Sequence, residues 1–223
     1  DDPSLLLINS GMAPMKKWFL GQEEPPRHRV TTCQKCIRTP DIERVGITAR
    51  HGCFFEMLGN WSLGDYFKHE SIAWSYELLT SEEWLGIDKD RLYFTCFEGD
   101  ENAPRDTESH DRWVEMGVDP SHIFYLGAKH NWWIPGNSGP CGPDTEIFFD
   151  TGKPKCCPEC NPSCDCGKYL EIWNNVFMQY YKDAEGNVTP LAKRNVDTGM
   201  GLDRTIATLQ GAESVYDTEG FAP

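Results

Sequence analysis

The chain has 223 residues, of which 39% are hydrophobic and 12% aromatic, and its formal net charge is −14. This length and apolar content suffice to bury one sizeable hydrophobic core or two small ones. The acidic balance disfavours tight RNA binding by these residues alone, because nucleic-acid binders meet the phosphate backbone with clustered lysine and arginine. The apolar stretch near the start, Leu5 to Ile8, is short and no run of about 18 apolar residues follows, so we expect neither a membrane span nor a signal peptide.

The predicted elements begin with a strand over 29–38, rich in β-branched and thiol residues, and a Thr-Pro-Asp turn signal over 39–41. A second strand over 52–59, which ends in a Gly-Asn turn, would return antiparallel to the first. Apolar residues at roughly helical spacing then predict a helix over 67–79. The remaining predicted elements are a strand over 91–97, a helix over 108–116, strands over 145–150 and 169–181, a strand that leads to Asp197, and a helix from about Met200 through Leu209.

This order of elements predicts the fold class. Antiparallel strands with helices gathered after them are typical of an α+β domain, in which helices flank an antiparallel sheet. The sequence contains no internal repeat or low-complexity segment that would indicate a different architecture.

The cysteines are distributed unevenly, since five of the ten lie between Cys156 and Cys166. Such clustering favours a metal site over a disulfide scaffold. The other five lie in or beside apolar runs, and we expect free thiols in a reducing, cytoplasmic compartment. The CxxC of Cys33 and Cys36 falls within a predicted strand, which favours a structural over a redox role.

The segment KCCPECNPSCDCGK over 155–168 carries a candidate structural zinc site. Four thiolates within a short loop can close a tetrahedral Zn²⁺ site, and the predicted ligands are Cys157, Cys160, Cys164 and Cys166. The short CxC spacing is unusual for zinc, and Cys156 is a competing ligand. The alternative is a reduced, thiol-rich loop without metal.

Two further patterns indicate phosphate or nucleotide chemistry. Arg38 and Asp41 stand at a strand end, where a carboxylate can pin a guanidinium that is aimed at a phosphate, although an ordinary surface ion pair would look the same. Near the end of the chain, Gly199 and Gly201 precede a helix that carries Arg204. The glycines leave room for a nucleotide, and an arginine one turn into the helix can stack on a planar ring or pair with a phosphate. A third glycine and a βαβ context are missing, so this pattern does not indicate a Rossmann fold.

Five segments resemble, in order and approximate spacing, the catalytic domain of the alanyl-tRNA synthetase family, which belongs to the class II aminoacyl-tRNA synthetases. They are Arg38 with Asp41, FFEMLGNWSLGDYF at 54–67, GPCGP at 139–143, EIWNNVFMQY at 171–180 and VDTGMGLDR at 196–204. In addition, SGMAPMKKWFLG at 10–21 looks like the first class II motif. The resemblance covers about 3–210 and departs from the family at Asp144, where the family more often has Cys.

The resemblance implies a class II aminoacylation domain over 1–210, with a Cys-rich insertion at 153–168 and the start of a further C-terminal region at 211–223. Its implied activity is the reaction of L-alanine with ATP and Mg²⁺ to alanyl-adenylate and, in a full-length protein, transfer of alanine to the 3′ end of tRNA(Ala). Two alternatives remain, a free-standing paralogue that activates a small amino acid for a non-tRNA acceptor and a non-catalytic binding module.

The resemblance also assigns roles to individual residues. The implied catalytic residues are Arg38, which would bind the α-phosphate, and Asp41, which would orient it. ATP binding is implied for Arg38, Arg50, His51, Phe55, Met57 and Arg204. Alanine binding is implied for Trp133, Asn174, Val176, Asp197 and Gly199. Phe55 and Arg204 would sandwich adenine, and His51 would share a strand face with Phe55 because the two are four residues apart. Asp197 would pair with the ammonium group, with Asp144 as the next candidate.

Overall fold

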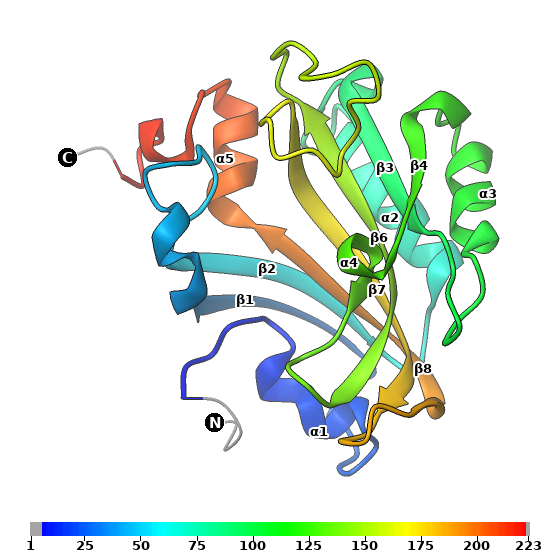
Figure 1. Cartoon of the computed structure of the whole chain (residues 1–223). Coiled ribbons are helices and arrows are strands. Elements are labelled where there is room, and N and C mark those ends of the chain that lie inside the picture. Colours follow the sequence, from blue (N-terminus) through cyan, green and yellow to red (C-terminus); the bar gives the residue numbers. More distant parts are fainter. Residues whose placement is uncertain (1–5, 222–223) are drawn as a thin grey trace.

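Figure 1 shows the computed structural model, which describes residues 6–221. Positions 1–5 of the expected catalytic domain and 222–223 of the expected C-terminal region lie outside the described residues. An eight-stranded sheet runs in the order β1-β2-β8-β7-β6-β3-β4, and β5 pairs with β6 beside this path. The strands are β1 (Arg29–Ile37), β2 (Phe54–Leu63), β3 (Leu92–Phe97), β4 (Ile123–Leu126), β5 (Trp132–Trp133), β6 (Gly139–Asp150), β7 (Tyr169–Lys182) and β8 (Val188–Gly201). All neighbouring strands are antiparallel except β3 and β4, so the predicted α+β class is confirmed.

The helices are short compared with the sheet. They are α1 (Lys16–Phe19), α2 (Lys68–Thr80), α3 (Thr107–Glu115), α4 (Ala128–Asn131) and α5 (Leu202–Gln210). Short 3-10 helices lie at Ala13–Met15, Thr39–Arg44, Lys89–Arg91, Pro120–His122 and Val215–Asp217. Across residues 6–221, no helix has both the length and the apolarity that crossing a bilayer requires.

The alternation of side chains along β7 builds a hydrophobic cluster on each face of the sheet. Trp173 and Phe177 belong to the larger cluster, to which α2 and α3 contribute Ile72, Leu79 and Trp113. Residues next to Phe177 on β7 point the other way and pack with Met12, Met15 and Phe19 from the N-terminal segment. Because successive side chains of a strand point to opposite faces, one strand serves both clusters. The N-terminal segment thereby covers the face opposite to α2 and α3.

Two glycines, Gly59 and Gly142, lie inside strands. The predicted turn at Gly59 is wrong, since β2 continues to Leu63 and the chain turns at Gly64, where φ is 75°. A Cβ on Gly59 would lie 2.4 Å from the Trp61 ring, and one on Gly142 would lie 2.0 Å from the carbonyl oxygen of Phe177. Because glycine has no side chain, the Trp61 ring and the backbone of Phe177 can approach these two positions closely, which explains glycine in the interior of a strand. GPCGP forms the start of β6, which therefore begins before the strand predicted over 145–150.

The other differences from the predicted elements are small. β8 continues to Gly201, so α5 begins at Leu202 and not at Met200. The sequence analysis missed β4, β5, α1 and α4, each of which has four residues or fewer. Such short segments contain too few positions to display a hydrophobic period.

Candidate active site

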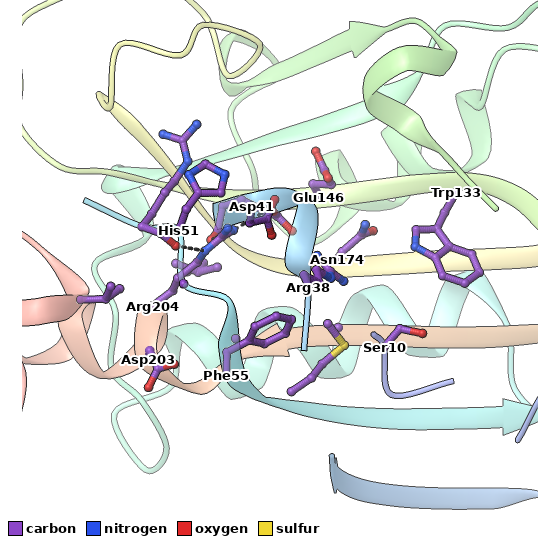
Figure 2. A pocket seen from close by; sticks show the side chains of 18 of the residues that line it. Ser10, Arg38, Asp41, His51, Phe55, Trp133, Glu146, Asn174, Asp203 and Arg204 are labelled. Atoms are coloured by element: carbon purple, nitrogen blue, oxygen red, sulfur yellow. Dashed lines mark hydrogen bonds and ion pairs between the residues drawn. The ribbon is translucent and has the colours of Figure 1, made fainter. Parts of the chain in front are cut away.

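A pocket of about 250 Å³ lies over the central strands, on the face covered by the N-terminal segment. Every residue to which the sequence analysis assigned catalysis, ATP binding or alanine binding lines this pocket. These residues are Arg38, Asp41, Arg50, His51, Phe55, Met57, Trp133, Asn174, Val176, Asp197, Gly199 and Arg204. In Figure 2, Trp133 and Ser10 lie at one end of the pocket, His51, Asp203 and Arg204 lie at the other, and Arg38 lies between them.

Strand register explains why side chains that are distant in the sequence meet here. Asp197 on β8 lies opposite Val176 on β7, and Gly199 lies opposite Asn174. Asn174 in turn lies opposite Glu146 on β6. Residues two apart on a strand face the same side, so the five positions form two adjacent rows across the sheet. Gly199 leaves the space above its row open.

Asp197 is a buried carboxylate without a partner. The residue is 5% exposed, and within residues 6–221 its carboxylate makes no hydrogen bond or ion pair. Burial raises the pKa of Asp197 to about 8, although the positive charge of Arg38 opposes this rise. A desolvated carboxylate gains strongly from a cation placed against it. The part of the pocket around Asp197 is therefore suited to bind an ammonium group.

Acceptors from other elements hold the pocket's arginines in place. Arg38 Nε donates to the carbonyl oxygen of Asn9 at 2.9 Å. Arg204 Nη1 donates to Glu171 Oε2 at 2.9 Å, from the start of α5 to β7. The predicted pinning of Arg38 by Asp41 is wrong for this structure, because Asp41 lies in the following 3-10 helix and a backbone carbonyl takes its place. Both residues nevertheless line the pocket.

The adenine-binding residues follow the prediction only in part. Phe55 lies on β2, and the guanidinium of Arg38 lies over its ring at 5.1 Å from the centroid. The inference that His51 shares a strand face with Phe55 is wrong, because β2 begins at Phe54 and His51 belongs to the loop before it. Burial, followed by the positive charges of Arg204 and Arg50, lowers the pKa of His51, which favours a neutral imidazole.

The sequence analysis missed three carboxylates of the pocket, Glu146 on β6, Glu171 on β7 and Asp203 at the start of α5. Burial, followed by the negative charges of Glu171 and Asp144, raises the pKa of Glu146 well above its usual range. Such proximity of carboxylates is favourable when a cation lies between them, and carboxylate oxygens are the ligands that Mg²⁺ prefers. The signal in the sequence that could have indicated Glu146 and Glu171 is a glutamate inside an apolar strand. Burial of a carboxylate without a partner is costly, so such a residue indicates a functional site.

Two buried polar atoms near Trp133 also lack partners. Within residues 6–221, neither Ser10 Oγ nor Asn174 Oδ1 makes a hydrogen bond. Both residues line the pocket, and Ser10 was not among the predicted site residues. Buried polar groups are nearly always paired, so these atoms are available to a polar ligand.

Asp144 lies behind the pocket and not in its lining. Its Oδ1 accepts a hydrogen bond of 2.8 Å from Asn131 Nδ2. Burial raises the pKa of Asp144 to about 8. Because Asn131 ends α4 two residues before Trp133, Asp144 supports the wall of the pocket. This position disfavours Asp144 as the alternative ammonium ligand.

The whole chain, residues 1–223, matches the family described as tRNA synthetases class II (A). The chain belongs to this family. It is 58% identical over 222 residues to an alanine–tRNA ligase from Treponema denticola, covering 99% of this chain and 37% of that protein. It is 56% identical over 223 residues to the alanine–tRNA ligase from Treponema pallidum, covering 100% of this chain and 37% of that protein.

Among solved structures, the chain is similar to apo histidyl-tRNA synthetase from S. aureus, with a TM-score of 0.49 and 12% sequence identity. The match covers 92% of this chain and 57% of that chain. The predicted class II synthetase membership is confirmed by the family match. The chain spans about 37% of the length of the two Treponema ligases.

In this class II family member, the segment after α5 contributes to the pocket. Val215 N donates to the carbonyl oxygen of Ala49 at 2.9 Å, and the Tyr216 hydroxyl donates to the carbonyl oxygen of His51. Val215 and Phe221 also line the pocket. The domain boundary at 210 stays a prediction, but residues 211–221 hold the loop that carries His51.

Five cysteine sulfurs gather in the loop between β6 and β7. The sulfurs of Cys156, Cys157 and Cys164 lie within 4.8 Å of one another, and so do those of Cys156, Cys160 and Cys166. Cys156, which the predicted ligand set omits, belongs to both groups. Hydrogen bonds with Cys160 and Cys166 raise the pKa of Cys156, and a divalent cation would reverse this effect by stabilising the thiolates. The donor set fits Zn²⁺, with Cys156 added to the candidate ligands.

If this loop holds zinc, protein purified without added metal should contain about one equivalent, and chelation should lower its thermal stability. Elemental analysis and thermal melts measure both. Cys156→Ser should reduce the zinc content, whereas Cys33→Ser, which removes an exposed thiol on β1, should not. A metal-free sample that melts like the untreated protein would contradict the zinc site.

Proposed function

We propose that the chain activates L-alanine with ATP and Mg²⁺ to form alanyl-adenylate and pyrophosphate. Within a longer alanine–tRNA ligase, the alanyl group would then pass to the 3′ end of tRNA(Ala). The observation that carries this proposal is the buried, unpartnered carboxylate of Asp197. Asp197 lies opposite Val176, whose cluster packs with Trp133, and Figure 2 places Arg38 between the Trp133 end of the pocket and the Arg204 end. Identity of 58% and 56% to two alanine–tRNA ligases supports the choice of amino acid.

In the proposed reaction, a carboxylate oxygen of alanine attacks the α-phosphorus of ATP, and the bond to pyrophosphate breaks. Arg38 would stabilise the negative charge that grows on the α-phosphate oxygens. Its position between the two ends of the pocket suits this role. Asp197 would hold the ammonium group, so that the carboxylate of alanine is directed toward Arg38. The fixed geometry removes much of the entropic cost of bringing the two substrates together.

The nucleotide would occupy the other end of the pocket. Adenine would stack between Phe55 and Arg204, with Met57 at its edge, because Met57 lies opposite Gly201 at the start of α5. Arg50 and His51 would contact the β- and γ-phosphates. The carboxylates of Glu146 and Glu171 would hold Mg²⁺, which neutralises phosphate charge when it is bound.

The shape of the other end supports selection of a small side chain. Trp133 and Val176 form apolar walls that fit a methyl group and exclude larger side chains sterically. One methyl group contributes only about 1 to 3 kcal/mol, so the pocket should exclude glycine weakly and serine poorly. Ser10 Oγ and Asn174 Oδ1 are buried without partners there, and they are consistent with weak exclusion of a hydroxyl group.

The partner outside this chain would be the acceptor end of tRNA(Ala). The net charge of −14 means that most of the attraction to RNA would come from other parts of a longer protein. A paralogue with a non-tRNA acceptor would form the aminoacyl-adenylate in the same pocket. A non-catalytic binding module would not form an adenylate at all. The cytoplasmic location inferred from the cysteines also stays a proposal.

Pyrophosphate exchange with each proteinogenic amino acid in turn tests the proposed function. We expect exchange with alanine, weaker exchange with serine and glycine, and none with larger amino acids, for the steric reason given above. Radiolabelled pyrophosphate entering ATP is the measurement. Exchange with a larger amino acid would contradict the alanine assignment, and no exchange with any would favour the binding module.

A further inference from the structure

Each arginine that lines the pocket is held by an acceptor from another part of the chain. For Arg38 and Arg204 these acceptors are Asn9 and Glu171, as described above. For Arg50 the acceptor is Asp165, whose Oδ1 lies 2.7 Å from Arg50 Nη2. Asp165 belongs to the cysteine-rich loop, between Cys164 and Cys166, and is 115 positions from Arg50 in the sequence. No role in the proposed reaction has been given to it so far.

The carboxylate of Asp165 bridges two arginines of the loop that precedes β2. Its second oxygen, Oδ2, lies 3.3 Å from Arg44 Nη2. The side chain of Arg50 is 17% exposed, whereas that of Asp165 is 69% exposed. We therefore take the contact to fix the position of Arg50, which is the more buried of the two side chains.

We propose that Asp165 is a positioning residue for ATP binding, which holds the Arg50 guanidinium at the triphosphate end of the pocket and separates it from Arg44. This inference rests on the proposed function, because it assigns Arg50 to the β- and γ-phosphates. The cysteine-rich loop thereby takes part in nucleotide binding through a residue that does not touch the nucleotide.

Two physical arguments favour positioning over competition with the phosphates. A guanidinium has five N–H donors, and the contact with Asp165 occupies Nη2, so other donors remain for phosphate oxygens. A free arginine loses rotamer entropy when it is fixed on a ligand, and a contact that fixes it beforehand removes part of that cost. The repulsion between the exposed Asp165 and the triphosphate is screened by solvent and salt, which reduces the opposing effect.

The test is Asp165→Asn, compared with Asp165→Glu and with Glu159→Gln. Glu159 is an acidic residue of the same loop that makes no side-chain ion pair within residues 6–221, so it is a matched control for charge. We expect Asp165→Asn to weaken ATP binding about two- to fivefold, which is the upper part of the range for an exposed ion pair. Asp165→Glu should restore much of the affinity, and Glu159→Gln should not change it. Calorimetric titration with ATP and Mg²⁺ measures the affinity directly.

Two further readouts separate positioning from a general effect on the fold. Asp165→Asn should raise the KM for ATP in pyrophosphate exchange and leave the KM for alanine unchanged. In protein that already carries Arg50→Ala, Asp165→Asn should lose most of its effect on ATP binding. Unchanged or tighter ATP binding by Asp165→Asn would overturn the proposal, and so would an equal effect in the Arg50→Ala background. If the unsubstituted protein binds no ATP, the proposed function fails as well, whereas failure confined to the Asp165 variants overturns this inference alone.

Discussion

Replacing Arg38 with alanine should lower the rate of pyrophosphate exchange by about 100- to 1,000-fold, which is the usual cost of removing one preorganised charge donor. Arg38 lies between the amino-acid and nucleotide ends of the pocket, where charge grows on the α-phosphate. Its backbone anchor is the carbonyl oxygen of Asn9, at 2.9 Å from Nε. The loss should therefore appear in the rate of adenylate formation and leave the fold intact.

Arg29→Ala provides the matched control for this prediction. Arg29 begins β1, the strand that ends next to Arg38, and it pairs with Asp65 at 2.9 Å on the surface. Exposed ion pairs contribute little to stability, so this variant should melt and react nearly like the unsubstituted protein. Thermal melts of both variants distinguish lost chemistry from lost structure. Exchange by Arg38→Ala within a few-fold of the unsubstituted protein would show that the assignment of this residue is wrong.

Local patterns in the sequence predicted the strand that ends near Arg38 and the strand that leads to Asp197, whereas the role of Asp197 came from the resemblance to the synthetase family. A strand places alternate residues on one face, so the pattern from Val196 to Arg204 already fixes which side chains share the pocket with Gly199. The helix that carries Arg204 begins directly after this strand. The strand order of the sheet and its register bring these local pieces together, and neither was predicted from the sequence. The resemblance to known synthetases supplied the fold class and the roles of the residues.

Contacts between distant segments were not predictable in the same way. Arg50 and Asp165 are 115 positions apart, and Arg204 and Glu171 are 33 apart, so no local period connects them. The same limit applies to Gly142, because the need for glycine there comes from the carbonyl oxygen of Phe177, which lies 2.0 Å from where a Cβ would be. The residue required at such a position depends on which neighbouring strand packs against it, and this is determined only when the whole sheet has formed.

Replacing Asp197 should affect alanine and leave ATP almost untouched. Asp197 is 5% exposed, and its carboxylate has no hydrogen bond or ion pair within residues 6–221, so the ammonium group of alanine is the cation it lacks. A charge-assisted pair of this kind contributes roughly 1.5 to 3 kcal/mol. Asp197→Asn and Asp197→Ala should therefore weaken alanine binding at least about tenfold. ATP affinity should barely change, because its proposed contacts come from Phe55, Arg204 and Arg38.

The raised pKa of Asp197 adds a pH dependence to this prediction. Burial raises the pKa to about 8 in the empty pocket, and only the ionised carboxylate attracts an ammonium group. Binding of alanine must then release a proton below about pH 8, so affinity should fall as the pH falls, by up to about tenfold per unit. Asp197→Asn cannot ionise, and its weaker binding should lose this dependence.

A calorimetric comparison of two ligands decides whether Asp197 recognises the ammonium group. The ligands are a non-hydrolysable alanyl-adenylate analogue and its des-amino counterpart, which differ only in the amino group. The unsubstituted protein should prefer the amino form, increasingly so as the pH rises toward about 8, and Asp197→Asn should not discriminate between the two. Asp203→Asn, which changes a carboxylate at the opposite end of the same pocket, should retain the preference. Equal discrimination by the unsubstituted protein and Asp197→Asn would mean that Asp197 is structural. The ammonium group would then have to bind elsewhere, and the unpartnered Asn174 Oδ1 is the nearest candidate acceptor, because Asn174 lies opposite Gly199 in the neighbouring row.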